Sequence, residues 1–111
     1  MIEQIVLDYL EKNLSISAYP EEPESKPDKY LIVEANGGGE NNFINSAMVI
    51  IQSYAPSRYD AAMLNESVKE KMKCIIELDS IIKVTLNADY NYTDVKKKRP
   101  RYQAVFDVTY Y

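Results

Sequence analysis

Apolar and polar residues alternate most regularly in the last third of the chain. From residue 82 to residue 92, every second residue is apolar or aromatic: Ile82, Val84, Leu86, Ala88, Tyr90 and Tyr92. The same alternation returns from Tyr102 to Tyr110. Because successive side chains of a strand point to opposite faces, both segments are expected to be strands with one half-buried face. The intervening VKKKRP predicts a hairpin with a basic tip.

Two other segments show the helical period. Apolar residues form one stripe over Ile2 to Asn13, which predicts an amphipathic helix. A second stripe, after Pro56, consists of Ala61, Leu64, Val68, Met72, Ile75 and Ile76. Ser57 can cap this second helix, with Asp60 at its N3 position. We expect the helix to end between Glu77 and Asp79.

The remaining segments predict strands and loops. Residues 30–35 (YLIVEA) and 43–54 (FINSAMVIIQSY) are apolar and rich in β-branched residues, so both should be strands. A short extended piece is expected at residues 15–19. Residues 20–29 (PEEPESKPDK) predict a solvated loop, and residues 36–42 (NGGGENN) predict a flexible connection.

The predicted order of elements is α-β-β-β-α-β-β. This order indicates an α+β fold in which two helices pack on one face of a mostly antiparallel, four- to five-stranded sheet. Residues 1–111 fit a single domain, since domains typically contain about 100–150 residues.

Composition excludes several kinds of site. The chain has one Cys and no His, so neither a Ser-His-Asp nor a Cys-His catalytic set can form within it. A structural zinc site would need several Cys or His ligands. We therefore expect no enzyme, no metal and no cofactor. Cys74 falls on the apolar side of the second helix and is expected to be a buried thiol.

Charge is distributed unevenly. The chain holds 13 Lys and Arg against 17 Asp and Glu, for a net charge of −4, and the acidic excess lies in the first 29 residues. This profile argues against a dedicated nucleic-acid-binding protein, which favours a broad basic face. There is no apolar run of membrane-spanning length and no basic, signal-like N-terminus, so we expect a cytoplasmic protein with no membrane partner.

Two short motifs are candidate contact sites. Gly37, Gly38 and Gly39 could suggest a phosphate cradle, but Glu40 follows them and the chain enters a strand rather than a helix. The alternative is a loop that becomes ordered when neighbouring subunits pack on it. The basic run Lys96, Lys97, Lys98 and Arg99 predicts a solvated hairpin tip, or a contact with an acidic neighbour or with passing DNA.

The tyrosine content is unusual, with ten Tyr against two Phe. Tyrosine suits surfaces that are buried in an assembly but keep a wet edge. The same residues could instead simply cover the sheet, and the sequence leaves both interpretations open.

Several short stretches, taken in order, resemble a known family. They are IVEANGGG in residues 32–39, QSYAPS in residues 52–57 followed by Ala61-Ala62, and RYQA in residues 101–104. From about Ile2 to Tyr110 the chain resembles the small tail-terminator (tail completion, or minor capsid) proteins of tailed bacteriophages and of prophages of Gram-positive bacteria.

The resemblance implies a structural protein that forms a ring, usually a hexamer. Such a ring caps the tail tube, ends tube polymerisation and docks to the head–tail connector, with DNA only passing through its lumen. It implies assembly in the host bacterial cytoplasm and a final place at the head-proximal end of the virion tail. We expect the contacts with other subunits or with the tube at Gly37–Glu40 and Lys96–Arg99. The alternatives are a head-closure or neck protein, and a small nucleic-acid-binding module using the basic hairpin.

Overall fold

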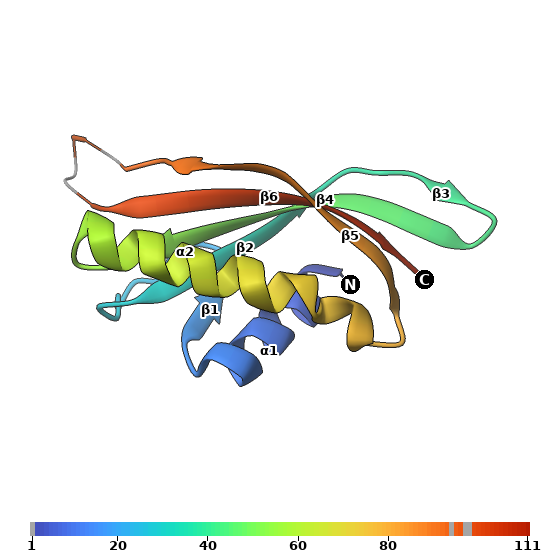
Figure 1. Cartoon of the computed structure of the whole chain (residues 1–111), viewed down its shortest axis with the longest axis horizontal. Coiled ribbons are helices and arrows are strands. Elements are labelled where there is room, and N and C mark those ends of the chain that lie inside the picture. Colours follow the sequence, from blue (N-terminus) through green and yellow to red (C-terminus); the bar gives the residue numbers. More distant parts are fainter. Residues whose placement is uncertain (1, 94, 97–98) are drawn as a thin grey trace.

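The computed structural model describes residues 2–93, 95–96 and 99–111. Along the chain it contains α1 (Ile2–Leu14), β1 (Ser17–Tyr19), β2 (Tyr30–Asn36), β3 (Glu40–Asn41), β4 (Ile44–Tyr54), α2 (Arg58–Lys73), the 3-10 turn η1 (Ile75–Glu77), β5 (Ile81–Asn91) and β6 (Arg101–Tyr110). Both helices lie on the same side of one twisted sheet (Figure 1).

The α+β class, the two helices and the mostly antiparallel sheet are confirmed. The sheet order is β1-β2-β4-β6-β5, with β3 paired to β4 beyond this path. Only β1 and β2 run parallel. The predicted strand number of four to five is wrong because the glycine-containing segment supplies a sixth strand, β3, that is only two residues long.

The core lies between the helices and the inner face of the sheet. Val6 of α1 and Val68 of α2 pack in one cluster with strand residues that include Leu31, Ile51 and Ala104, all of them fully buried. Alternate positions of β2, β4 and β6 supply these strand residues, as the period of two requires. No helix among the described residues has the length and apolar character needed to cross a membrane.

The predicted common face of residues 82–92 is wrong because β5 contains two register shifts. Leu86 pairs with Phe106 but Ala88 pairs with Val105, so Asn87 is an extra residue in the ladder. An extra residue of this kind is a β-bulge, and it reverses which side chains face the core. Ala88 and Tyr90 therefore lie on the outer face, opposite the helices, whereas Leu86 lies on the helix face.

The second helix begins as predicted and ends earlier. The Ser57 hydroxyl accepts a hydrogen bond from the Asp60 amide at 3.1 Å, which confirms the predicted cap. The α-helix stops at Lys73, and the chain continues as the tighter η1. This switch changes the angular step between residues. Ile75 is consequently buried, whereas Cys74 and Ile76 are exposed. The prediction of a buried Cys74 thiol is therefore wrong.

Candidate interaction surfaces

The two predicted contact sites lie at opposite ends of the molecule. The protein measures 45 × 25 × 24 Å, and Figure 1 shows the β3–β4 hairpin at one end and the β5–β6 connection at the other. The structure therefore does not bring Gly37–Glu40 and Lys96–Arg99 together in one site. Lys97 and Lys98 lie outside the described residues.

Glycines lie at the base of a hairpin, here called the arm (residues 36–46). Gly38 has a φ of +145°, and a Cβ atom there would stand 1.6 Å from the Ser46 carbonyl oxygen. The Ser46 amide donates to the Gly39 carbonyl at 3.0 Å, and Glu40 pairs with Asn45. The segment expected to be a flexible connection thus includes the short strand β3, and its glycines permit the close backbone approach. No helix follows them, so they form no phosphate cradle.

Replacing Gly38 with alanine is expected to open the arm without unfolding the domain. The added Cβ would overlap the Ser46 backbone, and a φ of +145° is strained for any L side chain. The core elements do not depend on this pairing, so cooperative unfolding should remain. Gly39→Ala is the matched control, since nothing lies within 4 Å of its Cβ position. Amide hydrogen exchange at residues 40–46 should rise only in Gly38→Ala, and equal exchange in the two variants would contradict this account.

The arm ends in an exposed aromatic side chain that the sequence reasoning did not single out. Asn42 and Phe43 have φ values of 53° and 66°. Two consecutive left-handed residues are typical of the type I′ turn, for which Asn-Gly is the preferred pair. A phenylalanine in the second position is unusual because its side chain crowds the backbone there. Phe43 is 86% exposed, and Ile44 beside it is also exposed.

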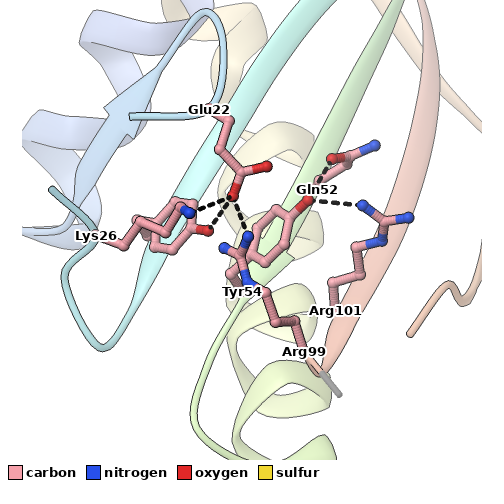
Figure 2. A network of polar contacts seen from close by, with 7 residues as sticks. Glu22, Lys26, Gln52, Tyr54, Arg99 and Arg101 are labelled. Carbon is pink, nitrogen blue, oxygen red and sulfur yellow. Dashed lines mark hydrogen bonds and ion pairs between the residues drawn. The ribbon is translucent and has the colours of Figure 1, made fainter. Parts of the chain in front are cut away.

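At the other end of the molecule, Arg99 is folded back onto the proline-rich loop. Glu22 accepts hydrogen bonds from Arg99 and, at 3.0 Å, from the Tyr30 hydroxyl, and it forms an ion pair with Lys26 at 3.8 Å (Figure 2). The loop expected to be only solvated is therefore tied to the sheet at Glu22. Arg99, one of the predicted contact residues, is therefore already engaged in an ion pair within its own chain.

A tyrosine and arginine cluster covers this end of the outer face. The rings of Tyr30 and Tyr54 stack 4.6 Å apart and nearly parallel. The guanidinium of Arg99 lies 4.8 Å from the Tyr54 ring centre, and Arg101 donates to the Tyr54 hydroxyl at 2.8 Å (Figure 2). Both tyrosines are buried, so these two cover the sheet. Tyr92, whose ring lies 4.3 Å from the Arg101 guanidinium, is 44% exposed.

A groove opens on the helix side of the sheet, between α2 and the edge strand β5. Its volume is about 640 Å³, and its lining residues are Glu66, Lys69, Glu70, Met72, Lys73, Ile76, Val84, Leu86 and Phe106. Ile76 and Leu86 are 53% and 45% exposed. Five of the nine lining side chains are apolar, and the four charged ones, all from α2, form one rim. Sequence reasoning missed this groove because the β5 bulge and the early end of α2 create it.

Lys69 on that rim is fixed by two carboxylates. Its ammonium lies 2.7 Å from Glu66 and also pairs with Asp89 of β5, and Asp89 accepts from the Asn65 amide at 2.6 Å. The hydrogen bond to Asp89, followed by that to Glu66, raises the pKa of Lys69 above its ordinary 10.5. This polar bridge ties α2 to the strand after the bulge.

Stability should fall at alkaline pH as Lys69 loses its proton. A raised folded-state pKa stabilises the fold fully below the unfolded value, and this contribution disappears as the pH rises through the folded pKa. Burial also raises the pKa of the Tyr9 phenol. Ionisation of Tyr9 at alkaline pH therefore lowers the stability further. Lys69→Met should therefore show a shallower loss of unfolding free energy above pH 10.5 in urea titrations. A native-like decline in Lys69→Met would contradict the assignment.

No protein-family model matches the chain, and no curated protein matches it either. In the part of the chain that the structure describes, no group of three or more Cys, Asp or Glu side chains is placed to hold a metal ion.

Proposed function

We propose that this protein is a structural subunit of a tailed-bacteriophage virion, a tail terminator that assembles into a ring on the end of the tail tube. The ring, which we take to be a hexamer, would end tube polymerisation and offer the docking surface for the head–tail connector. The sequence resemblance suggests this role. The arm, with its exposed Phe43, is the structural observation that supports it most directly.

The arm favours an assembly role because the fold of a single chain makes no use of its tip. Phe43 and Ile44 expose apolar surface at the end of a hairpin that projects beyond the helices (Figure 1). Exposed apolar side chains grouped in this way are typical of interaction sites. A surface at one end that contacts a different surface on the next copy generates a ring when the rotation closes.

The opposite end of the molecule supports contact with a second partner. Arg99 and Lys26 form ion pairs with Glu22 there, and Arg101 donates to the Tyr54 hydroxyl, so charged and aromatic side chains gather at this end. A joint between tube and connector needs two different surfaces on one subunit, and this chain offers an apolar arm at one end and charged and aromatic side chains at the other.

The test is the growth of tail tubes in the presence of this protein. The tail-tube protein encoded nearest to this chain should polymerise to open-ended lengths alone, as followed by light scattering. Adding this protein at substoichiometric amounts should stop growth and shorten the tubes, because only tube ends are needed as binding sites. Unchanged growth would contradict the terminator role. It would favour the head-closure or neck role, for which the expected partner is the connector.

The second candidate is a small nucleic-acid-binding module. It is favoured by one observation, the half-exposed Tyr92 stacked against Arg101 beside the basic connection, since bases stack on exposed aromatic rings. This candidate predicts strongly salt-dependent DNA binding that the triple variant Lys96→Ala, Lys97→Ala, Lys98→Ala would weaken. The terminator role predicts no measurable binding at physiological salt. Fluorescence anisotropy with duplex and single-stranded DNA distinguishes the two.

A further inference from the structure

The arm and the groove are complementary surfaces on one chain. The arm ends in the exposed ring of Phe43, and the groove presents Ile76 and Leu86 over a floor of Met72 and Phe106. At about 640 Å³ the groove falls within the range of pockets that enclose ligand groups. It is large enough to receive an aromatic side chain together with part of the hairpin that carries it.

Charge complementarity suggests how the two surfaces would align. Glu40 lies in the arm close to Phe43, and Lys73 lies on the groove rim beside Ile76. Within the described part of the chain, neither Glu40 nor Lys73 forms an ion pair. The rim charges Glu66 and Lys69 already bind each other. Glu70 lies one helical turn before Lys73 on the same rim, so the unpaired acid of the arm and the unpaired base of the rim match when the arm enters at the Ile76 end of the groove, where it meets Lys73 first.

The arm cannot fill the groove of its own chain. No arm residue lines the groove, and β6 separates β4, which carries the arm, from β5. Figure 1 shows the arm extending beyond the end of α2 rather than back toward it. The occupant that this chain itself supplies is the arm of a second copy.

We propose that the arm of one copy docks in the groove between α2 and β5 of the next copy, with Phe43 on the apolar floor and Glu40 against Lys73. This proposal rests on the proposed ring and identifies its contact between subunits. Because arm and groove are different surfaces, each copy can give one arm and receive one. Such a contact can close a ring, extend along an open chain, or be exchanged reciprocally in a twofold dimer, and the proposed ring corresponds to the first of these arrangements.

A charge exchange tests the pairing. Glu40→Lys and Lys73→Glu each place like charges together, and each should weaken self-association by about tenfold or more, measured by sedimentation velocity. The double variant Glu40→Lys with Lys73→Glu should recover native association. Lys83→Glu is the matched control, because Lys83 is exposed on the same strand, β5, but points to the outer face. Additive losses in the double variant would overturn the proposal.

Cross-linking detects the contact even where association is weak. Cys74, the one cysteine of the chain, is exposed next to Lys73, so Asn41→Cys on the arm should link to Cys74 of a neighbour through a short bismaleimide. Each chain then carries two different cysteines, and the products should form a ladder beyond dimers. Adding Cys74→Ser should remove the ladder. Tyr59→Cys, at a site that is also exposed but at the far end of α2, should give none.

The outcomes separate this proposal from the proposed function. Tubes that are capped by a protein giving no ladder and no charge-exchange rescue would overturn the arm-to-groove contact alone. A clear ladder and rescue in a protein that leaves tube growth unchanged would support this contact and contradict the terminator role.

Discussion

Replacing Phe43 with glycine is expected to abolish self-association while leaving the fold intact. The substitution removes the 86% exposed ring from the arm. It also places the preferred residue in the second position of the type I′ turn, where Phe43 has a φ of 66°. A non-glycine residue in this region costs about 1–2 kcal/mol, so relief of that strain offsets the greater freedom that glycine has in the unfolded chain.

The measurement combines association and stability in one set of samples. Sedimentation velocity should show Phe43→Gly as a monomer at concentrations where the native chain associates. Urea unfolding should place its unfolding free energy within about 1 kcal/mol of the native value. Tyr59→Ala is the matched control, since it removes another exposed aromatic ring (73%) from the start of α2. Native-like association of Phe43→Gly would show that the arm tip is not the contact.

The largest effect on stability is expected at Ile51. This side chain is fully buried on the helix face of β4. It packs in the core cluster that contains residues of both α1 and α2. Truncating a large buried aliphatic side chain costs about 2–5 kcal/mol, because transfer energy is lost and a cavity remains. Ile51→Ala should therefore lose much of the stability typical of a domain of this size.

Ile50 provides the matched control for this prediction. It is the preceding residue of the same strand, pairs with Val105 on the outer face and is only partly buried. Ile50→Ala should cost clearly less than Ile51→Ala in urea unfolding at neutral pH. Equal losses at the two positions would contradict the assignment of the helix-covered face.

Local patterns in the sequence predicted the elements well where one period runs without interruption. α1 ends within one residue of its predicted end, and the cap at Ser57 is present as predicted. In both segments a single apolar period decides which face is buried, and tertiary packing agrees with it. For the same reason, the observed bounds of β2, β4 and β6 match the predicted bounds almost residue for residue.

The errors arise where one residue changes the phase. The extra Asn87 in β5 leaves the alternation of letters intact, because Leu86, Ala88 and Tyr90 remain two apart, yet it moves the later ones to the outer face. The switch from α2 to η1 acts in the same way on Cys74. The backbone hydrogen bonds made with other parts of the chain determine both the bulge in β5 and the end of α2. The local amino-acid composition gives no sign of either.

The candidate surfaces were only partly visible in the sequence. The glycines were noticed, but their role depends on Ser46 seven to nine residues later. One signal was present: the predicted strand 43–54 is twice as long as the predicted strand 30–35 with which it pairs in the structure, so its first residues needed another partner. The tie between Glu22 and Arg99 joins residues 77 positions apart. A contact at that separation leaves no local pattern.

Electron microscopy of tail-tube ends tests the central claim most directly. Purified tubes are imaged with and without this protein, and with Phe43→Gly as the arm-deficient form. The account predicts a ring on one end of each tube with the native protein, whose subunits can then be counted, and bare ends with Phe43→Gly. Bare tube ends in the presence of native protein would contradict the terminator role.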